Sequence, residues 1–137
     1  MIIDADILDS LTAAAKSSPR LRMNYDLRTS PADNSQRMLN ALEPETQVPV
    51  HRHRNSTETF VILRGRALQR FYDEDGNVTE EILVDADGPC RMISIEQGRW
   101  HNLVSLETGT VIFESKDGAF EPRLPEDEMK NNQLLTI

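Results

Sequence analysis

The sequence contains little cysteine, few aromatic residues and a shortage of basic charge, and each shortage excludes a class of protein. Only Cys90 is a cysteine among the 137 residues, which excludes an intrachain disulfide framework and favours a reducing compartment. Aromatic residues make up 5%, too few for a surface that stacks single-stranded nucleic acid. The net charge of −8 argues against binding to a nucleic-acid duplex or to an anionic membrane.

Long hydrophobic runs are also absent. No stretch approaches the roughly 18 apolar residues that a membrane-spanning helix needs. The first six residues contain two aspartates and no basic residue, whereas a signal peptide begins with a basic region. We therefore expect a cytoplasmic protein without membrane contacts. With 38% hydrophobic and 28% charged residues, the chain is suited to one compact domain.

Charge is distributed unevenly along the chain. Residues 1–19 carry −2, residues 20–70 carry +4 and residues 71–137 carry −10. Twelve of the fifteen cations are arginines, whose guanidinium groups suit bidentate contacts with carboxylate or phosphate. Two interpretations follow: a solvated surface of uneven charge, or a region formed by residues 20–70 that attracts small anions.

The pattern of apolar residues predicts one short helix followed by many strands. Asp9 or Ser10 can cap a helix over residues 11–16, and Pro19 ends it. From residue 21 onward, apolar and polar residues alternate with the period of a strand. The strand-like runs cover residues 21–26, 37–43, 48–53, 57–64, 67–72, 78–84, 91–95, 100–105 and 110–115. Turn residues separate the runs, and Asp75-Gly76 predicts a hairpin.

Eight or nine short strands predict an all-β fold, either a β-sandwich or a small barrel. We expect an N-terminal helical segment (1–19), a barrel (20–120) and a polar C-terminal tail (121–137) that forms a loosely attached arm. Both faces of the run 58–63 are largely apolar, so a helix, the N-terminal strand or a second subunit should cover its outer face. We predict that the protein is a homodimer.

The three histidines have the spacing of metal ligands. His51 and His53 project from one face of a strand, Glu58 opens the next strand, and His101 lies on another strand. Three imidazoles and one carboxylate can converge on one ion and leave positions open for water or substrate. Such a set suits Fe, Mn, Co, Ni, Cu or Zn. The alternative is a metal-free pocket of the same shape.

These residues resemble the two sequence motifs of the cupin superfamily. In the first motif, His51-x-His53 is followed after four residues by Glu58 and after six more by Gly65. The second motif is matched by Glu96-x-Gly98-x-x-His101. Proline usually stands at the position of Glu96. Beyond these motifs, the runs 33–44, 49–54, 58–65 and 100–114 resemble the WbuC-type cupin metalloproteins.

The resemblance implies a cupin fold, a small antiparallel β-barrel or jelly roll. It also implies that a divalent metal is bound through the matching residues His51, His53, Glu58 and His101. Members of this family are associated with surface-polysaccharide gene clusters, but the resemblance supplies no established reaction.

Because the metal would occupy every histidine, proton transfer needs another group. A water activated by the metal, a loosely bound Glu58, Tyr25 or Tyr72 could carry it. For each tyrosine, the alternative role is packing of the ring within a strand.

Arginines are the candidate contacts for an anionic ligand. Arg37 and Arg64 could hold a small anionic or sugar-derived molecule beside the metal. Arg52 and Arg54 face away from it and should form ion pairs or a subunit contact.

Three functions remain open from the sequence, and whether the protein is an enzyme is open with them. The first is metal-assisted isomerase, epimerase or lyase chemistry on a small anionic or sugar-derived substrate. The second is an Fe(II)-dependent dioxygenase. The third is a non-catalytic module that binds its ligand through the metal.

Overall fold

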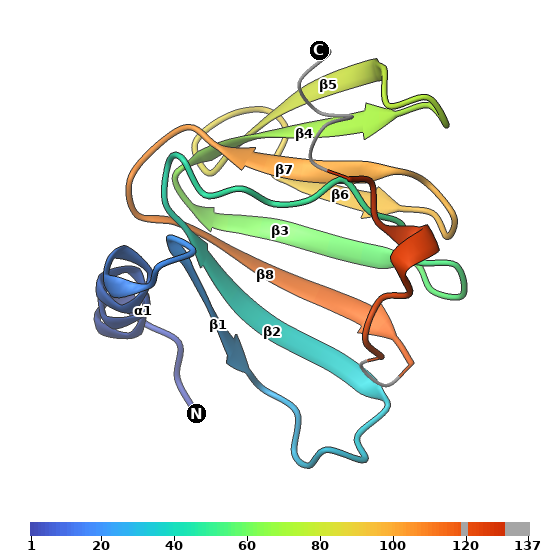
Figure 1. Cartoon of the computed structure of the whole chain (residues 1–137). Helices are drawn as coiled ribbons and strands as arrows, with labels where there is room; N and C mark the ends of the chain where they lie inside the picture. The colour runs from blue at the N-terminus through green and yellow to red at the C-terminus, as the bar shows by residue number, and fades with distance from the viewer. Residues whose placement is uncertain (119–120, 131–137) are drawn as a thin grey trace.

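The structure is a computed structural model that describes residues 1–118 and 121–130 (Figure 1). In this part of the chain one α-helix precedes eight strands, and a short 3-10 helix follows them. The elements are α1 (Ala5–Ser17), β1 (Arg22–Asp26), β2 (Ser35–Leu42), β3 (Glu58–Arg64), β4 (Arg66–Tyr72), β5 (Val78–Asp85), β6 (Met92–Ile95), β7 (His101–Ser105), β8 (Thr110–Asp117) and η1 (Pro125–Asp127). No helix within the described ranges is long and apolar enough to cross a membrane.

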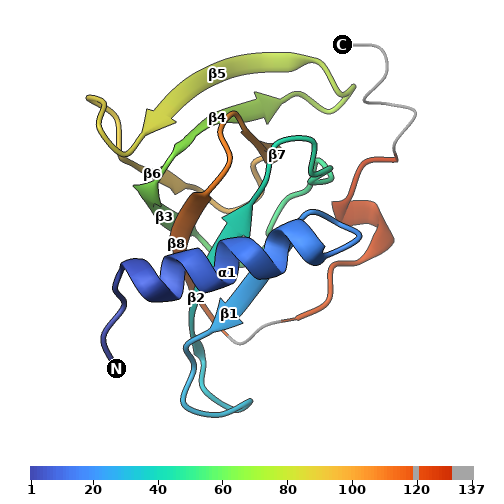
Figure 2. The same ribbon diagram turned by 90° about the vertical axis from the view of Figure 1, so that its left-hand side faces the viewer.

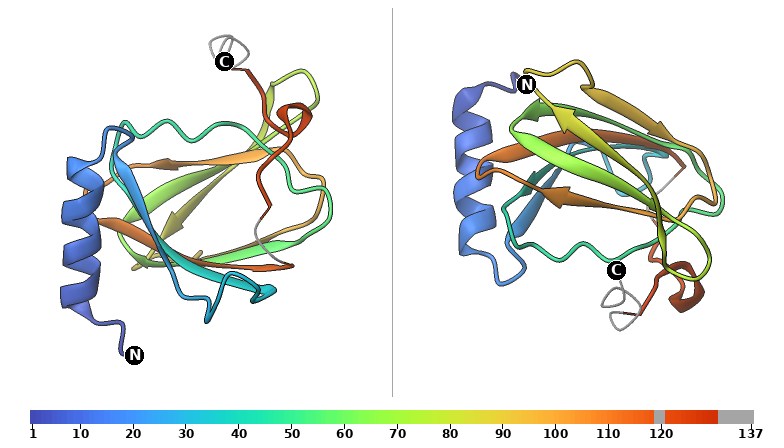
Figure 3. Two further views of the ribbon diagram at one scale, coloured as in Figure 1. Left: turned by 60° about the horizontal axis from the view of Figure 1, so that its bottom comes forward. Right: turned by 90° about the horizontal axis from the view of Figure 1, so that it is seen from above.

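The strands form two antiparallel sheets that lie over each other as two layers (Figures 1 and 3). The larger sheet has the strand order β1-β2-β8-β3-β6, and the smaller has the order β5-β4-β7. Strands β4 and β5 form the hairpin that Asp75-Gly76 predicts, and Gly76 has a φ of +87° in its turn. The prediction of an all-β fold of antiparallel strands with a short N-terminal helix is confirmed.

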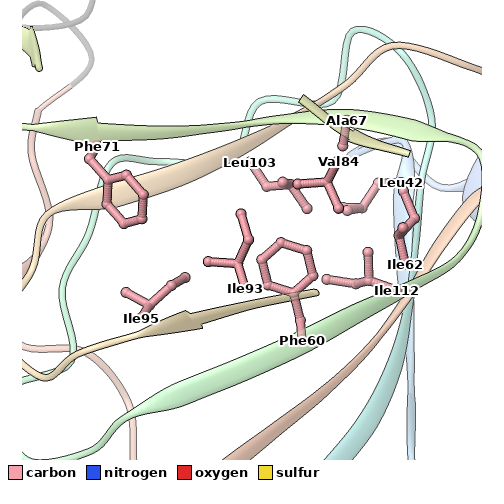
Figure 4. Packing of buried hydrophobic residues seen from close by; sticks show 10 residues of the cluster. All are labelled: Leu42, Phe60, Ile62, Ala67, Phe71, Val84, Ile93, Ile95, Leu103 and Ile112. Carbon is pink, nitrogen blue, oxygen red and sulfur yellow. The ribbon is translucent and has the colours of Figure 1, made fainter. Parts of the chain in front are cut away.

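The main hydrophobic core lies between the two sheets (Figure 4). Phe60 and Ile112 extend from the larger sheet, and Phe71, Ala67 and Leu103 meet them from the smaller one. Since successive strand residues point to opposite faces, every second side chain enters this layer.

Helix α1 covers the outer face of the larger sheet. The Asp4 side chain caps it by accepting a hydrogen bond from the Ile7 amide at 3.2 Å, so the helix begins at Ala5 rather than near residue 11. Leu11 and Ala15 are buried with side chains of β2 and β8, as the crossing of α1 over these strands in Figure 2 shows. Part of the apolar outer face is therefore covered by this chain itself.

The prediction of a strand at residues 48–53 is wrong. Only His51 forms bridges there, one to His101 and one to Glu128. Pro49 has no amide hydrogen to donate, which interrupts regular pairing at this point.

The beginning of the C-terminal tail packs onto the barrel and is not a loose arm. Met129 is 5% exposed and contacts the cluster of Val50, Tyr72 and Trp100. Its amide donates to the Val50 carbonyl at 2.8 Å, and the Arg52 amide donates to the Asp127 carbonyl at 3.0 Å. Residues 131–137 of the expected arm lie outside the described residues.

Candidate metal centre

The structure brings the four predicted ligands together. His51, His53, Glu58 and His101 each offer one ligand atom, and these atoms lie within 4.8 Å of one another. His51 and His101 pair through their backbones, and Glu58 opens β3. Ligand atoms about 2.1 Å from a shared ion lie up to about 4.2 Å apart, so movements of a few tenths of an ångström would complete a site.

Backbone carbonyls orient two of the imidazoles. Nδ1 of His51 lies 2.8 Å from the Pro49 carbonyl oxygen, and Nδ1 of His101 lies 2.8 Å from that of Arg99. A carbonyl only accepts, so each Nδ1 carries the hydrogen and Nε2 is directed toward the centre. Metal-binding histidines are held in this way in proteins.

The arrangement of His101 is compatible with a bound cation. Its Nδ1 donates to a carbonyl, while its Nε2 lies 3.2 Å from Oε2 of Glu58. A metal ion bound by both Nε2 and the carboxylate would hold these two atoms at about this distance. His53 Nε2 lies 3.0 Å from the same oxygen.

Local electrostatics favour the protonation states that a metal needs. Burial alone would raise the pKa of Glu58, but hydrogen bonds from His101 and His53 hold it well below its ordinary value. Burial lowers the pKa of His51, and the neighbouring His101 and Arg123 lower it further. An ionised carboxylate and a neutral imidazole are the forms that bind metal.

The cluster lies in the wall of a cavity of about 430 Å³, a size typical of small-molecule sites. Four basic side chains line this cavity: Arg20, Arg22, Lys116 and Arg123. Three carboxyl side chains line it as well, Glu58, Glu114 and Glu128. The cavity therefore offers a metal site beside several cations.

The structure places Arg37 outside this cavity. Its guanidinium donates to Asp33 at 3.0 Å and to the Leu27 carbonyl at 3.3 Å. Gln36 and Met38, the neighbours of Arg37 in β2, line the cavity instead. Because neighbouring strand residues point to opposite faces, Arg37 shares the face that α1 covers.

Arg64 also points away from the cavity. A register shift between Ile62 and Arg64 breaks the alternation that would have placed both side chains inside. The guanidinium of Arg64 pairs instead with Asp9 at 2.6 Å and donates to Thr12 Oγ1 at 3.0 Å. Arg64 thus fastens α1 to the sheet.

Neither tyrosine lines the cavity. Tyr25 is 40% exposed and shares the face of β1 from which Met23 packs against the helix cluster. The Tyr72 hydroxyl donates to Asn102 Oδ1 at 2.8 Å, and burial raises its pKa. Of the three candidate proton-transfer groups, only Glu58 is at the centre.

The sequence reasoning missed Glu114. It lines the cavity from β8, and Asn40 donates a hydrogen bond to its carboxyl group. Burial raises the pKa of Glu114, and the charge of Glu58 raises it further. The alternation Ile112, Glu114, Lys116 was the available signal, since it places all three on the inner face.

Two antiparallel sheets around a cluster of three histidines and one glutamate define a cupin-fold protein with a candidate metal site. Residues 3–84 match the family described as a domain of unknown function (DUF6016), and the chain belongs to this family. No curated protein sequence matches the chain.

Solved structures of other proteins share the fold. Capsular polysaccharide assembling protein CapF from Staphylococcus aureus superposes with a TM-score of 0.65 at 22% identity over 82% of this chain and 32% of its own. Oxalate oxidase in complex with the substrate analogue glycolate gives 0.59 at 16% identity, covering 76% of this chain and 54% of its own. The Schizosaccharomyces pombe Cnp3 cupin domain gives 0.57 at 10% identity, covering 71% and 64%. The chain thus spans only about a third of CapF and about half of oxalate oxidase.

Proposed function

We propose that the protein binds one divalent transition metal through His51, His53, Glu58 and His101 and acts on a small anionic or sugar-derived metabolite. The reaction class is metal-assisted isomerase, epimerase or lyase chemistry. The carrying observation is a complete ligand set in the wall of a cavity that is lined by four cations.

The metal would supply Lewis-acid polarisation of a carbonyl or hydroxyl oxygen. The chain itself supplies the groups that bind the substrate and move protons. The carboxyl of Glu114 is the candidate group for giving or taking a proton, because it lines the same cavity and Asn40 holds it in place.

Basic side chains at the cavity support an anionic ligand. The Arg22 guanidinium donates to the Gln47 carbonyl at 2.9 Å and to Thr46 Oγ1 at 3.3 Å, which fixes its position. Arg20, Lys116 and Arg123 also line the cavity, so basic side chains outnumber the three carboxyl side chains there, whereas acidic residues outnumber basic ones in the whole chain.

A role in surface-polysaccharide biosynthesis has two supports. The sequence resembles the WbuC-type cupins, and the fold is similar to that of CapF, a capsular polysaccharide assembling protein. We propose on that resemblance that the chain is a WbuC-type cupin.

An Fe(II)-dependent dioxygenase is the second candidate. The fold is shared with oxalate oxidase, whose structure holds the small carboxylate glycolate. Oxygen uptake by the iron-loaded protein would favour this candidate, and a zinc- or manganese-loaded protein indifferent to oxygen would favour the first. The third candidate is a non-catalytic module, which would bind its ligand without turnover.

We further propose a homodimer in the cytoplasm. Leu63 is 40% exposed and Met92 is 60% exposed, and their strands, β3 and β6, are paired at the edge of the larger sheet. The single cysteine supports a reducing compartment.

The metal site is tested with the double variant His51→Ala/His53→Ala. Elemental analysis should find about one ion per chain in the wild type and none in the variant. Asn55→Ala, in the loop that follows His53, is the matched control and should retain the metal. Circular dichroism checks that each variant is folded. Unchanged metal content in a folded double variant would overturn the assignment.

A further inference from the structure

Three arginines from two distant segments meet at the cavity. Arg20 and Arg22 flank Leu21 at the start of β1, and Arg123 belongs to the C-terminal segment. All three arginines line the 430 Å³ cavity. Burial lowers the pKa of Arg22, and the charges of Arg20 and Arg123 lower it further. These three side chains, the arginine group, therefore bring like charges together in one part of the cavity wall.

The carboxyl groups of the cavity compensate this charge only in part. Oε2 of Glu128 lies 3.1 Å from Nε of Arg123, and the charge of Glu128 also acts on Arg22. The other two carboxyl side chains, Glu58 and Glu114, interact with each other at the metal cluster. Within the described ranges, the other two members of the arginine group form no ion pair. Three positive charges thus face one carboxylate, which leaves two of them without a counterion.

The backbone between the two neighbouring arginines has a rare conformation. Leu21 has a φ of +57°, which residues with a bulky side chain seldom adopt. The Thr46 hydroxyl donates to the Arg20 carbonyl at 2.6 Å, and the Glu43 amide donates to the Leu21 carbonyl at 3.0 Å. The Arg22 guanidinium donates in turn to Thr46. Strained residues persist where the surrounding structure fixes them, and they concentrate at ligand sites.

The arginine group adjoins the metal cluster. Arg123 and His53 both line the 430 Å³ cavity and a second cavity of about 220 Å³. The charge of Arg123 is also among the causes, after burial and the charge of His101, that lower the pKa of His51. One small molecule can therefore contact the metal cluster at one end and the arginine group at the other.

We infer that Arg20, Arg22 and Arg123 bind a phosphoryl group, and that the ligand is a phosphorylated small molecule. This inference rests on the proposed function and deepens it, because it names the class of anion and the residues that select it. A phosphate monoester carries about −1.5 to −2 charges at pH 7 and has three terminal oxygens. A carboxylate has a single charge and two oxygens. The phosphoryl group is therefore the better match for several guanidinium forks with two uncompensated charges.

The test compares glucose 6-phosphate with glucuronate, two sugars that differ in the anionic group at one end, by calorimetry on the metal-loaded protein. The wild type should bind glucose 6-phosphate at least about tenfold more tightly. Arg20→Gln and Arg123→Gln should each weaken this binding about tenfold and leave the metal content unchanged, because each removes a charged hydrogen bond. Arg91→Gln is the matched control, since Arg91 is exposed and lines neither cavity. It removes the same charge and should leave the affinity unchanged, and circular dichroism checks that each variant is folded.

Glu128→Gln provides a second measurement with the opposite sign. The glutamine keeps an acceptor for Arg123 but removes the negative charge beside the arginine group. Binding of glucose 6-phosphate should therefore become several-fold tighter. If these side chains served only to hold the C-terminal segment in place, Glu128→Gln and Arg123→Gln would both weaken binding, and that result would overturn the inference.

The remaining outcomes separate this inference from the proposed metal site. Binding of neither probe, or an equal loss of affinity in Arg91→Gln, would overturn the inference. A metal-loaded wild type that does not prefer glucose 6-phosphate contradicts the role of the arginine group alone. A wild type without metal whose preference for glucose 6-phosphate is lost in Arg123→Gln supports the arginine group and contradicts the metal site.

Discussion

The attachment of the C-terminal segment to the barrel makes Met129 a sensitive position. Met129 is 5% exposed and packs against Val50, Tyr72 and Trp100. It belongs to the segment that hydrogen-bonds to the backbone on both sides of His51. Met129→Ala removes most of this side chain and leaves a cavity next to the segment that carries two of the candidate ligands, His51 and His53.

The expected loss of stability in Met129→Ala follows from the burial of the methionine side chain. Truncating a buried methionine to alanine costs about 2–5 kcal/mol. Because the segment is terminal, it can detach locally, which limits the loss to the free energy of its attachment. We therefore expect the lower end, a loss of about 2 kcal/mol in the free energy of unfolding. For a chain of this length that corresponds to a fall in Tm of roughly 8 °C.

The chain contains a single tryptophan, Trp100, so its fluorescence reports on this cluster directly. In Met129→Ala the emission should shift to longer wavelength as water reaches the indole, together with the fall in Tm. Leu124→Ala is the matched control, since Leu124 precedes the same segment and is 54% exposed. It should change stability by less than about 0.5 kcal/mol. A Tm within 1 °C of the wild type (about 0.3 kcal/mol) and unshifted emission in Met129→Ala would refute the packing argument.

Two further predictions concern the cavity and the turn between β3 and β4. The pKa of Glu114 is raised in the folded protein, so folding favours its protonated form, and stability should fall as pH rises above 4.5 through the folded pKa. Glu114→Gln mimics the protonated form. With chelator present, the variant should therefore be more stable to urea than the wild type at pH 8 and equally stable near pH 4.5. An equal difference at both pH values would contradict the raised pKa of Glu114. Gly65 has a φ of +89°, and an added Cβ would lie 2.3 Å from Thr110 Oγ1, so Gly65→Ala should cost at least about 2 kcal/mol. Gly98→Ala is the control, because Gly98 has a φ of +82° and an added Cβ would have no atom within 4 Å. It should reduce the free energy of unfolding by only about 1 kcal/mol. Equal losses for the two variants in urea unfolding would show that the close contact with Thr110 is unimportant.

Much of the fold and the four candidate metal ligands could be predicted because their signals are local. Alternation of apolar residues identified all eight strands to within about two residues at each end, and it failed only for residues 48–53. The histidine spacing and Glu58 belong to motifs that can be read without knowing how the sheets pack. The start of α1 was missed because Asp4, rather than Asp9 or Ser10, caps it.

The arginines that line the cavity could not be predicted in the same way. Alternation separates the two faces of a strand but does not say which face is the inside, and in β2 both faces carry apolar residues. Packing of α1 on Leu39 and Ala41 makes the face of Arg37 the outer one. The basic side chains that do line the cavity come from distant segments, among them Arg20, Lys116 and Arg123.

The sequence by itself determined the all-β architecture, the N-terminal helix and the identity of the four candidate ligands, because alternation, capping and motif spacing are properties of short segments. Only the tertiary structure decided which groups face the cavity, since that depends on contacts between residues far apart in the chain. It placed Arg37 and Arg64 outside the cavity and Glu114 in the wall of the cavity, and it packed Met129 onto the barrel. The groups that surround the candidate ligands were therefore decided by the packing of the sheets and of α1, and not by the motifs.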